Sequence, residues 1–94
     1  MALARVVSFE GVDQDRMEKS RRDIGEGDPP EGMPASEIVV LYDTEREQSL
    51  AIVFFETEDD YRRGDETLNA MPAGETPGQR ASVTKYEVVV RRTV

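Results

Sequence analysis

The stretch SLAIVFFETEDD, residues 49–60, gives the clearest indication of the fold. Residues 49–56 form the most hydrophobic segment of the chain and are rich in β-branched and aromatic side chains, which favours a strand. Thr57-Glu58-Asp59-Asp60 follows at once and has the form of a capping box, with Asp in place of the preferred Glu or Gln at its fourth position. The sequence therefore predicts a buried strand that passes directly into a helix.

The helix expected after this capping box has one apolar face. Tyr61, Leu68 and Met71 fall at the three- and four-residue spacings of one side of a helix. Pro72 ends the pattern, because proline lacks the amide hydrogen that a helix interior needs. Gly64 lowers intrinsic helix stability by about 1 kcal/mol relative to Ala, and we expect it to permit close approach to a strand.

A charged loop joins the strand at 49–56 to the strand before it. Glu37–Tyr42 is a short apolar run between polar residues, which is typical of a strand buried on both faces. Residues 43–48 are charged and polar, and their number suits a hairpin loop. We therefore expect these two strands to pair antiparallel.

The flanking segments complete the order β-α-β-β-α-β. Strands are expected at 3–9 and 82–92, a helix at 13–24 with Asp13 as its N-cap, and long loops at 25–34 and 73–80. The expected apolar anchors of the first helix are Val12, Met17 and Ile24. This order is that of the ferredoxin-like α+β fold, a four-stranded antiparallel sheet with two helices on one face. The length of 94 residues fits a single domain over residues 1–94.

The second and third strands are apolar on both faces. In the first of these strands, Ile38, Val40 and Tyr42 face one side and Val39 and Leu41 the other. In the second, Leu50, Ile52 and Phe54 lie opposite Ala51, Val53 and Phe55. Two helices cover only one of these faces, and soluble monomers rarely expose an apolar patch on the order of several hundred Å². We expect a second copy of the chain to cover the other face, because a two-fold interface is self-complementary.

The amino-acid composition excludes several classes of active site and metal site. The chain has no His and no Cys, so it lacks an imidazole base, a thiolate nucleophile and the usual ligands of zinc or haem iron, and we expect no cofactor and no metal. A net charge of −8 argues against nucleic acid as a partner. No run approaches the roughly 18 apolar residues of a membrane span, and no basic segment precedes an apolar one at the N-terminus. We therefore expect no membrane contact and a cytoplasmic location.

Four segments distributed along the chain carry a family resemblance. They are residues 31–34 (EGMP), 41–46 (LYDTER), 54–66 (FFETEDDYRRGDE) and 82–88 (SVTKYEV). The chain resembles the dimeric α+β barrel proteins, and among them the uncharacterised relatives of antibiotic biosynthesis monooxygenases. The resemblance implies that two ferredoxin-like sheets pair face to face across a dimer axis, which would cover the second apolar face.

The resemblance also implies a ligand pocket in each protomer, between the helices and the sheet. Members of the family oxygenate polycyclic phenols without a cofactor or degrade haem, and they use combinations of Trp, Asn, His and Arg. This sequence contains neither Trp nor His. It therefore lacks the iron ligand and the characteristic aromatic residue of the haem-degrading members.

The second expected helix carries four candidate ligand-pocket residues. Tyr61 lies at the start of the helix that would cover a pocket, and Leu68 shares its face. Asn69, the only Asn of the chain, can orient a phenolate or serve as a polar residue near a helix C-terminus. Arg62, with Arg63, can clamp a carboxylate or phenolate, or pair with acidic residues of the same helix in solvent.

Three further candidates are the aromatic residues Phe54, Tyr42 and Tyr86. Aromatic side chains line pockets for flat apolar ligands, and a Tyr hydroxyl can donate a hydrogen bond to such a ligand. The same residues also suit a core or a dimer interface. No residue is assigned a catalytic role from the sequence.

Three functions remain open at this point. The first is a small-molecule-binding homodimer of the antibiotic biosynthesis monooxygenase-like superfamily, with a flat hydrophobic ligand between Tyr61, Leu68 and the sheet. The second is a cofactor-independent monooxygenase of a phenolic or polycyclic substrate, oriented by Asn69, Tyr61 and Arg62. The third is a structural or interaction module that uses the acidic surface.

Overall fold

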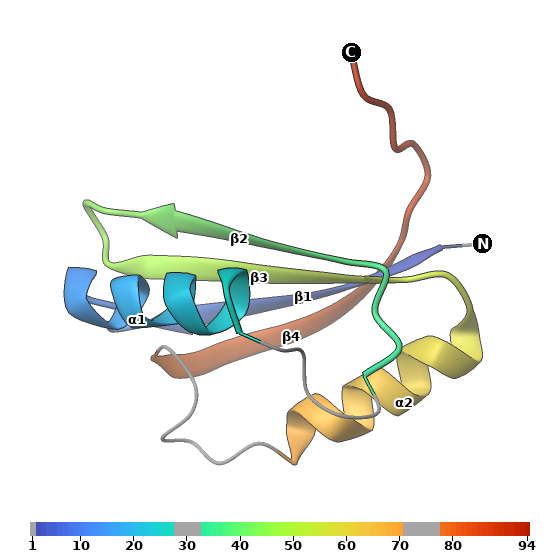
Figure 1. Ribbon diagram of the computed structural model, residues 1–94, viewed down its shortest axis with the longest axis horizontal. Helices are drawn as coiled ribbons and strands as arrows, with labels where there is room; N and C mark the ends of the chain where they lie inside the picture. The colour runs from blue at the N-terminus through green and yellow to red at the C-terminus, as the bar shows by residue number, and fades with distance from the viewer. Residues whose placement is uncertain (1, 28–32, 71–77) are drawn as a thin grey trace.

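The computed structural model describes residues 2–27, 33–70 and 78–94 and has the predicted order β-α-β-β-α-β (Figure 1). The elements are β1 (Leu3–Glu10), α1 (Gln14–Gly25), β2 (Glu37–Asp43), β3 (Gln48–Phe55), α2 (Glu58–Asn69) and β4 (Gln79–Glu87). Predictions that concern residues 28–32 and 71–77, including Met71, Pro72 and much of both long loops, lie outside the described residues.

The four strands form one antiparallel sheet in the order β2-β3-β1-β4. β2 and β3 make the predicted hairpin, with Asp43 paired to Gln48 at its closed end. β1 lies between β3 and β4 and pairs with both. The protein therefore has the ferredoxin-like α+β fold that the sequence predicts.

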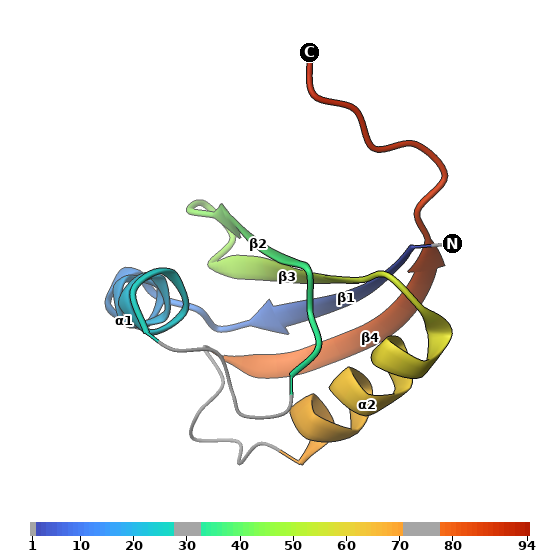
Figure 2. The ribbon, with the colours of Figure 1, turned by 45° about the vertical axis from the view of Figure 1, so that its right-hand side comes forward.

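Both helices lie on the same side of the sheet (Figure 2). Each covers a separate apolar cluster, and the two clusters occupy opposite ends of the strands. The α1 cluster consists of Val7, Phe9, Val12 and Met17, and the α2 cluster consists of Leu3, Val53, Phe55 and Tyr61. In the described part of the chain, neither helix is long and apolar enough to cross a membrane.

Both predicted N-caps are confirmed. The side chain of Asp13 accepts a hydrogen bond from the backbone N–H of Arg16 at 2.8 Å. Thr57 accepts one from the backbone N–H of Asp60 at 3.1 Å. Each cap satisfies an amide that the first helical turn leaves without a partner, so both helices begin where the sequence places them.

Two predictions about packing and strand limits are wrong. Ile24 is 45% exposed and does not anchor α1, which is held through Val12 and Met17 near its start. β4 begins at Gln79, within the predicted loop, because a bulge in the pairing of β1 with β4 brings Gln79 opposite Glu10. It ends at Glu87 and not at 92, because Glu87 pairs with the first residue of β1.

Residues 88–94, which we call the C-terminal arm, leave the sheet on the side opposite the helices (Figures 1 and 2). The amide of Val88 donates to the carbonyl of Ala2 at 2.9 Å. Further along, Arg91 bonds to Glu37 and lies 4.3 Å from the ring centre of Phe54. The arm thus crosses the end of the helix-free sheet face.

Candidate functional site

The two apolar candidates on α2 pack into the sheet. Tyr61 is buried, and its ring meets the ring of Phe55 edge to face at a centroid distance of 5.5 Å. Leu68 packs against the same α2 cluster. On the side that faces the sheet, Tyr61 therefore packs against Leu3, Val53 and Phe55.

Gly64 allows α2 to lie close to β3 of the sheet. A Cβ atom at this position would lie 2.2 Å from Cε1 of Phe55, far inside van der Waals contact. The predicted close approach of this glycine to a strand is confirmed. It brings the polar residues of the next helical turn within reach of β1 and β4.

Four polar residues meet there, and we call them the arginine cluster: Arg5, Asp65, Asn69 and Arg80. Arg5 lies on the helix-covered face of β1, and its Nε donates to Asp65 Oδ1 at 2.8 Å. Its Nη2 donates to Asn69 Oδ1 at 3.0 Å. Arg80 Nη1 donates to the same Asn69 oxygen at 2.9 Å. Asn69 therefore accepts from two guanidinium groups at once.

Tyr61 lies beside this cluster. Burial raises the pKa of its hydroxyl, and the Asp65 carboxylate raises the pKa further, while Arg5 and Lys85 act in the opposite direction. Lys85 Nζ lies 5.0 Å from the centre of the Tyr61 ring and pairs with Glu58. The hydroxyl of Tyr61 is consequently protonated near neutral pH and is not a general base there.

The structure gives two other candidates local partners. The Tyr42 hydroxyl donates to the carbonyl of Val12 at 2.8 Å, which ties β2 to the start of α1. Desolvation raises the pKa of Tyr42, and three nearby carboxylates add to the rise. Arg62 is exposed and lies 3.4 Å from Asp59 on the same helix, which is the solvent pairing considered from the sequence.

Phe54 and Tyr86 lie on the other side of the sheet, which we call the open face. Three rows of paired residues cross it: Leu41, Leu50, Ser8 and Ser82; Val39, Ile52, Val6 and Thr84; and Glu37, Phe54, Ala4 and Tyr86. Leu41 is 50% exposed, Leu50 39% and Tyr86 54%. The open face is therefore apolar across much of its width and uncovered by either helix.

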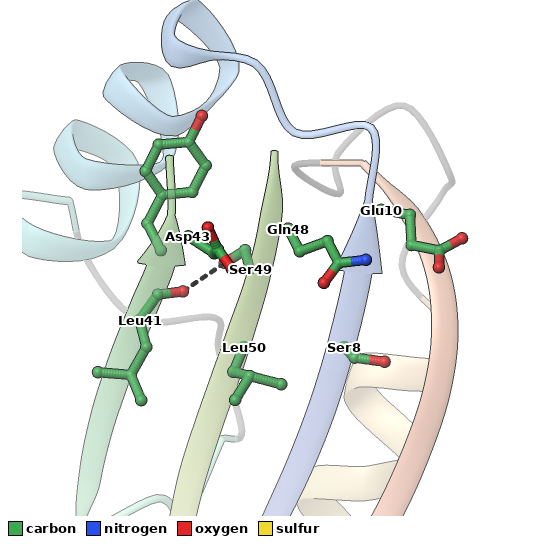
Figure 3. A pocket seen from close by; sticks show the side chains of 8 residues that line it. Ser8, Glu10, Leu41, Asp43, Gln48, Ser49 and Leu50 are labelled. Atoms are coloured by element: carbon green, nitrogen blue, oxygen red, sulfur yellow. Dashed lines mark hydrogen bonds between the residues drawn. The ribbon is translucent and has the colours of Figure 1, made fainter. Parts of the chain in front are cut away.

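A hollow of about 330 Å³ lies at the hairpin end of the open face (Figure 3). Leu41 and Leu50 provide its apolar lining, and Ser8, Glu10, Asp43 and Gln48 surround them with polar groups. Ser49 Oγ donates to the carbonyl of Leu41 at 3.1 Å, which fixes the backbone at this edge. The hollow is open to solvent on the side away from the helices.

The seven candidate residues do not form one pocket. Tyr61, Leu68 and Asn69 lie together beneath and beside α2, whereas Phe54 and Tyr86 lie on the open face. Tyr42 contacts the start of α1 and also lines the hollow at the hairpin end, and Arg62 pairs with Asp59 in solvent.

Arg5 and Arg80 were missed from the sequence, although one of them had a visible signal. Arg5 alternates with Leu3 and Val7 along β1, so strand periodicity already puts it on the buried face. Arg80 had no such signal, because it was assigned to the loop before β4. A buried Arg within an apolar strand is the pattern that would have indicated this cluster.

Within residues 2–27, 33–70 and 78–94, no three acidic side chains come together in a way that could hold a metal ion. Comparisons of the chain with protein-family models, with curated proteins and with solved structures found no match.

Proposed function

We propose that the protein is a homodimeric small-molecule-binding protein of the dimeric α+β barrel type, related to the antibiotic biosynthesis monooxygenases. In this proposal a second copy of the chain covers the open face. The observation that carries it is the apolar composition of that face, on a sheet whose two described helices lie on the other side.

Burial of the open face is energetically favourable. Each Å² of apolar surface removed from water contributes about 25 cal/mol, and Leu41, Leu50 and Tyr86 are each more than a third exposed. The charged residues Glu37, Asp43 and Glu10 lie at the ends of strands, so the centre of the face carries no charge to desolvate. Such a surface suits a self-complementary two-fold contact.

The C-terminal arm adds apolar surface on the same side. Val89 and Val90 are 83% and 80% exposed, and Arg91 holds the arm near Phe54. A second copy on the open face would meet these valines as well as the sheet. The arm therefore supports a partner on this side.

The ligand proposed is a flat, neutral, apolar molecule. A second copy would close the hollow at the hairpin end, turning an open depression into an enclosed site. Leu41 and Leu50 offer it apolar contacts, and Ser8 and Gln48 offer hydrogen bonds. The carboxylates of nearby acidic residues disfavour an anionic ligand there.

The assembly is tested by light scattering on the purified protein at low and high concentration. We expect the wild type to be a dimer and Leu50→Arg to be a monomer, because the new charge would be buried in the interface. Ile24→Arg is the matched control, since Ile24 is similarly exposed but lies on α1; it should remain dimeric. A wild type that is monomeric throughout the range contradicts the proposal.

Ligand binding is tested separately by the melting temperature in the presence of 1-naphthol. The wild type should melt at a higher temperature with 1-naphthol, and Leu50→Arg should lose this response. An unchanged response in Leu50→Arg would contradict a site in the hollow while leaving the dimer untouched.

A further inference from the structure

The arginine cluster contains a buried cation whose carboxylate partner is partly exposed. The side chain of Arg5 is 4% exposed, whereas that of Asp65 is 34% exposed. Burial of a guanidinium is costly unless its charge and its N–H groups are matched. Asp65 accepts from Nε of Arg5, whereas among the described residues Nη2 of the same group donates to the uncharged oxygen of Asn69 and to no carboxylate.

Arg80 brings a second cation to that uncharged oxygen. Its Nη1 and the Nη2 of Arg5 both donate to Asn69 Oδ1, at 2.9 and 3.0 Å. An amide oxygen has two lone pairs, so these two bonds use its whole accepting capacity. Among the described residues, Arg80 has no carboxylate within ion-pair distance. Two cations thus converge on one carboxylate and one amide, in a chain whose net charge is −8.

We propose that the arginine cluster is a binding site for the carboxylate group of a small organic acid. The planar carboxylate matches the planar fork of a guanidinium, and such charge-assisted bonds are among the stronger polar contacts in proteins. Arg80 and Asn69 are exposed and provide the approach from solvent, while buried Arg5 forms the fixed inner wall. The site lies on the helix-covered side of the sheet and is separate from the hollow on the open face.

Within the described part of the chain, Asn69 is the position at which a carboxylate would match this charge. An Asp at the same position would supply a second carboxylate to both guanidinium groups without a change in side-chain shape. The wild-type amide instead orients the two arginines and leaves their charge available to a ligand. This arrangement differs from a purely structural ion pair, for which the carboxylate would be the better residue.

The test is the melting temperature of the full chain as benzoate replaces chloride at constant ionic strength. Benzoate should raise the melting temperature of the wild type, and Arg80→Gln should weaken its apparent affinity by about tenfold, as expected for loss of one charge-assisted contact. Arg62→Gln is the matched control on the same side of the sheet, because Arg62 is exposed and paired with Asp59; its response should equal that of the wild type.

Asn69→Asp provides the decisive variant. It should melt at a higher temperature than the wild type without benzoate, because it neutralises both arginines, and it should lose the benzoate response. In the wild type, benzoate should also shift the side-chain amide resonance of Asn69, which is the only Asn in the chain.

Four results would overturn the inference: no benzoate response in the wild type, a full response in Asn69→Asp, an equal loss in Arg62→Gln and Arg80→Gln, or an equal response to inorganic phosphate. The inference is independent of the proposed dimer. The Leu50→Arg variant, whose substitution lies on the opposite side of the sheet, should keep the benzoate response.

Discussion

Gly64 of α2 faces the ring of Phe55 with no room for a side chain. Ala is the better helix former by about 1 kcal/mol, but its methyl group would overlap a fully buried ring. We expect Gly64→Ala to lower the free energy of unfolding by about 1–3 kcal/mol, the usual cost of overpacking. Chemical denaturation measures this.

Gly25→Ala is the control for that experiment. Apart from its chain neighbours and the backbone of its own helix, no atom of the described residues lies within 4 Å of a Cβ built on Gly25, which ends α1. This variant should be neutral or slightly more stable than the wild type. Equal destabilisation by both substitutions would contradict the steric argument.

The raised pKa of Tyr61 predicts a dependence of stability on pH. The folded state holds the hydroxyl proton more tightly than the unfolded chain, where the pKa is near 10.0. The stabilisation is therefore complete below pH 10 and is lost as the pH rises through the raised pKa of the folded state. Tyr61→Phe should reduce the loss of unfolding free energy above pH 10.

Urea denaturation at a series of alkaline pH values tests this prediction. Tyr86→Phe is the comparison, because Tyr86 lies on the other side of the sheet from α2 and does not contact Asp65. Superimposable pH profiles for wild type and Tyr61→Phe would show that burial of Tyr61 does not couple to its ionisation.

The side chain of Thr57 caps the N-terminus of α2. Thr57→Ala removes the acceptor for the Asp60 amide and should cost about 1 kcal/mol of unfolding free energy. Thr57→Ser keeps a hydroxyl and should retain most of the stability. Thermal unfolding followed by circular dichroism gives both values, and equal melting temperatures for the two variants would exclude the cap as the cause.

At the scale of elements, the accurate predictions came from local signals. The caps Asp13 and Thr57 mark helix starts through their own side-chain chemistry, and alternation correctly separated the two faces of β2 and β3. The end of β4 depends on a distant partner, the first residue of β1. The exposure of Ile24 depends on which residues pack against the end of α1. A short stretch of sequence around each of these positions does not contain the residues with which they pair or pack.

At the scale of the whole molecule, the proposed dimer predicts that stability depends on protein concentration. Mass action favours the folded dimer at higher concentration, so the melting temperature of the wild type should rise with it. Leu50→Arg should melt at one temperature over the same range. Differential scanning fluorimetry over a wide dilution series distinguishes the two behaviours, and a constant wild-type value would contradict the dimer.

The candidate site was only partly accessible to sequence reasoning for a similar reason. Asn69 was identified because it is the only Asn of the chain and lies near a helix end, but its two arginine partners come from β1 and β4. Their convergence follows from the strand order, in which β1 and β4 are neighbours. Spacing along the chain does not show which side chains of β1 and β4 meet at Asn69.

The same strand order sets the sequence in which the protein can form as it is synthesised. Of the six elements, β1 is synthesised first, yet it pairs only with β3 and β4. The pair with the smallest separation along the chain is that of Phe9 with Ser49. The β2–β3 hairpin is the one strand pair of the described sheet with a short connection. Strand pairs with a short connection form fastest. We therefore expect β1 to remain unpaired in the nascent chain until the β2–β3 hairpin has formed, after which β1 can pair with β3.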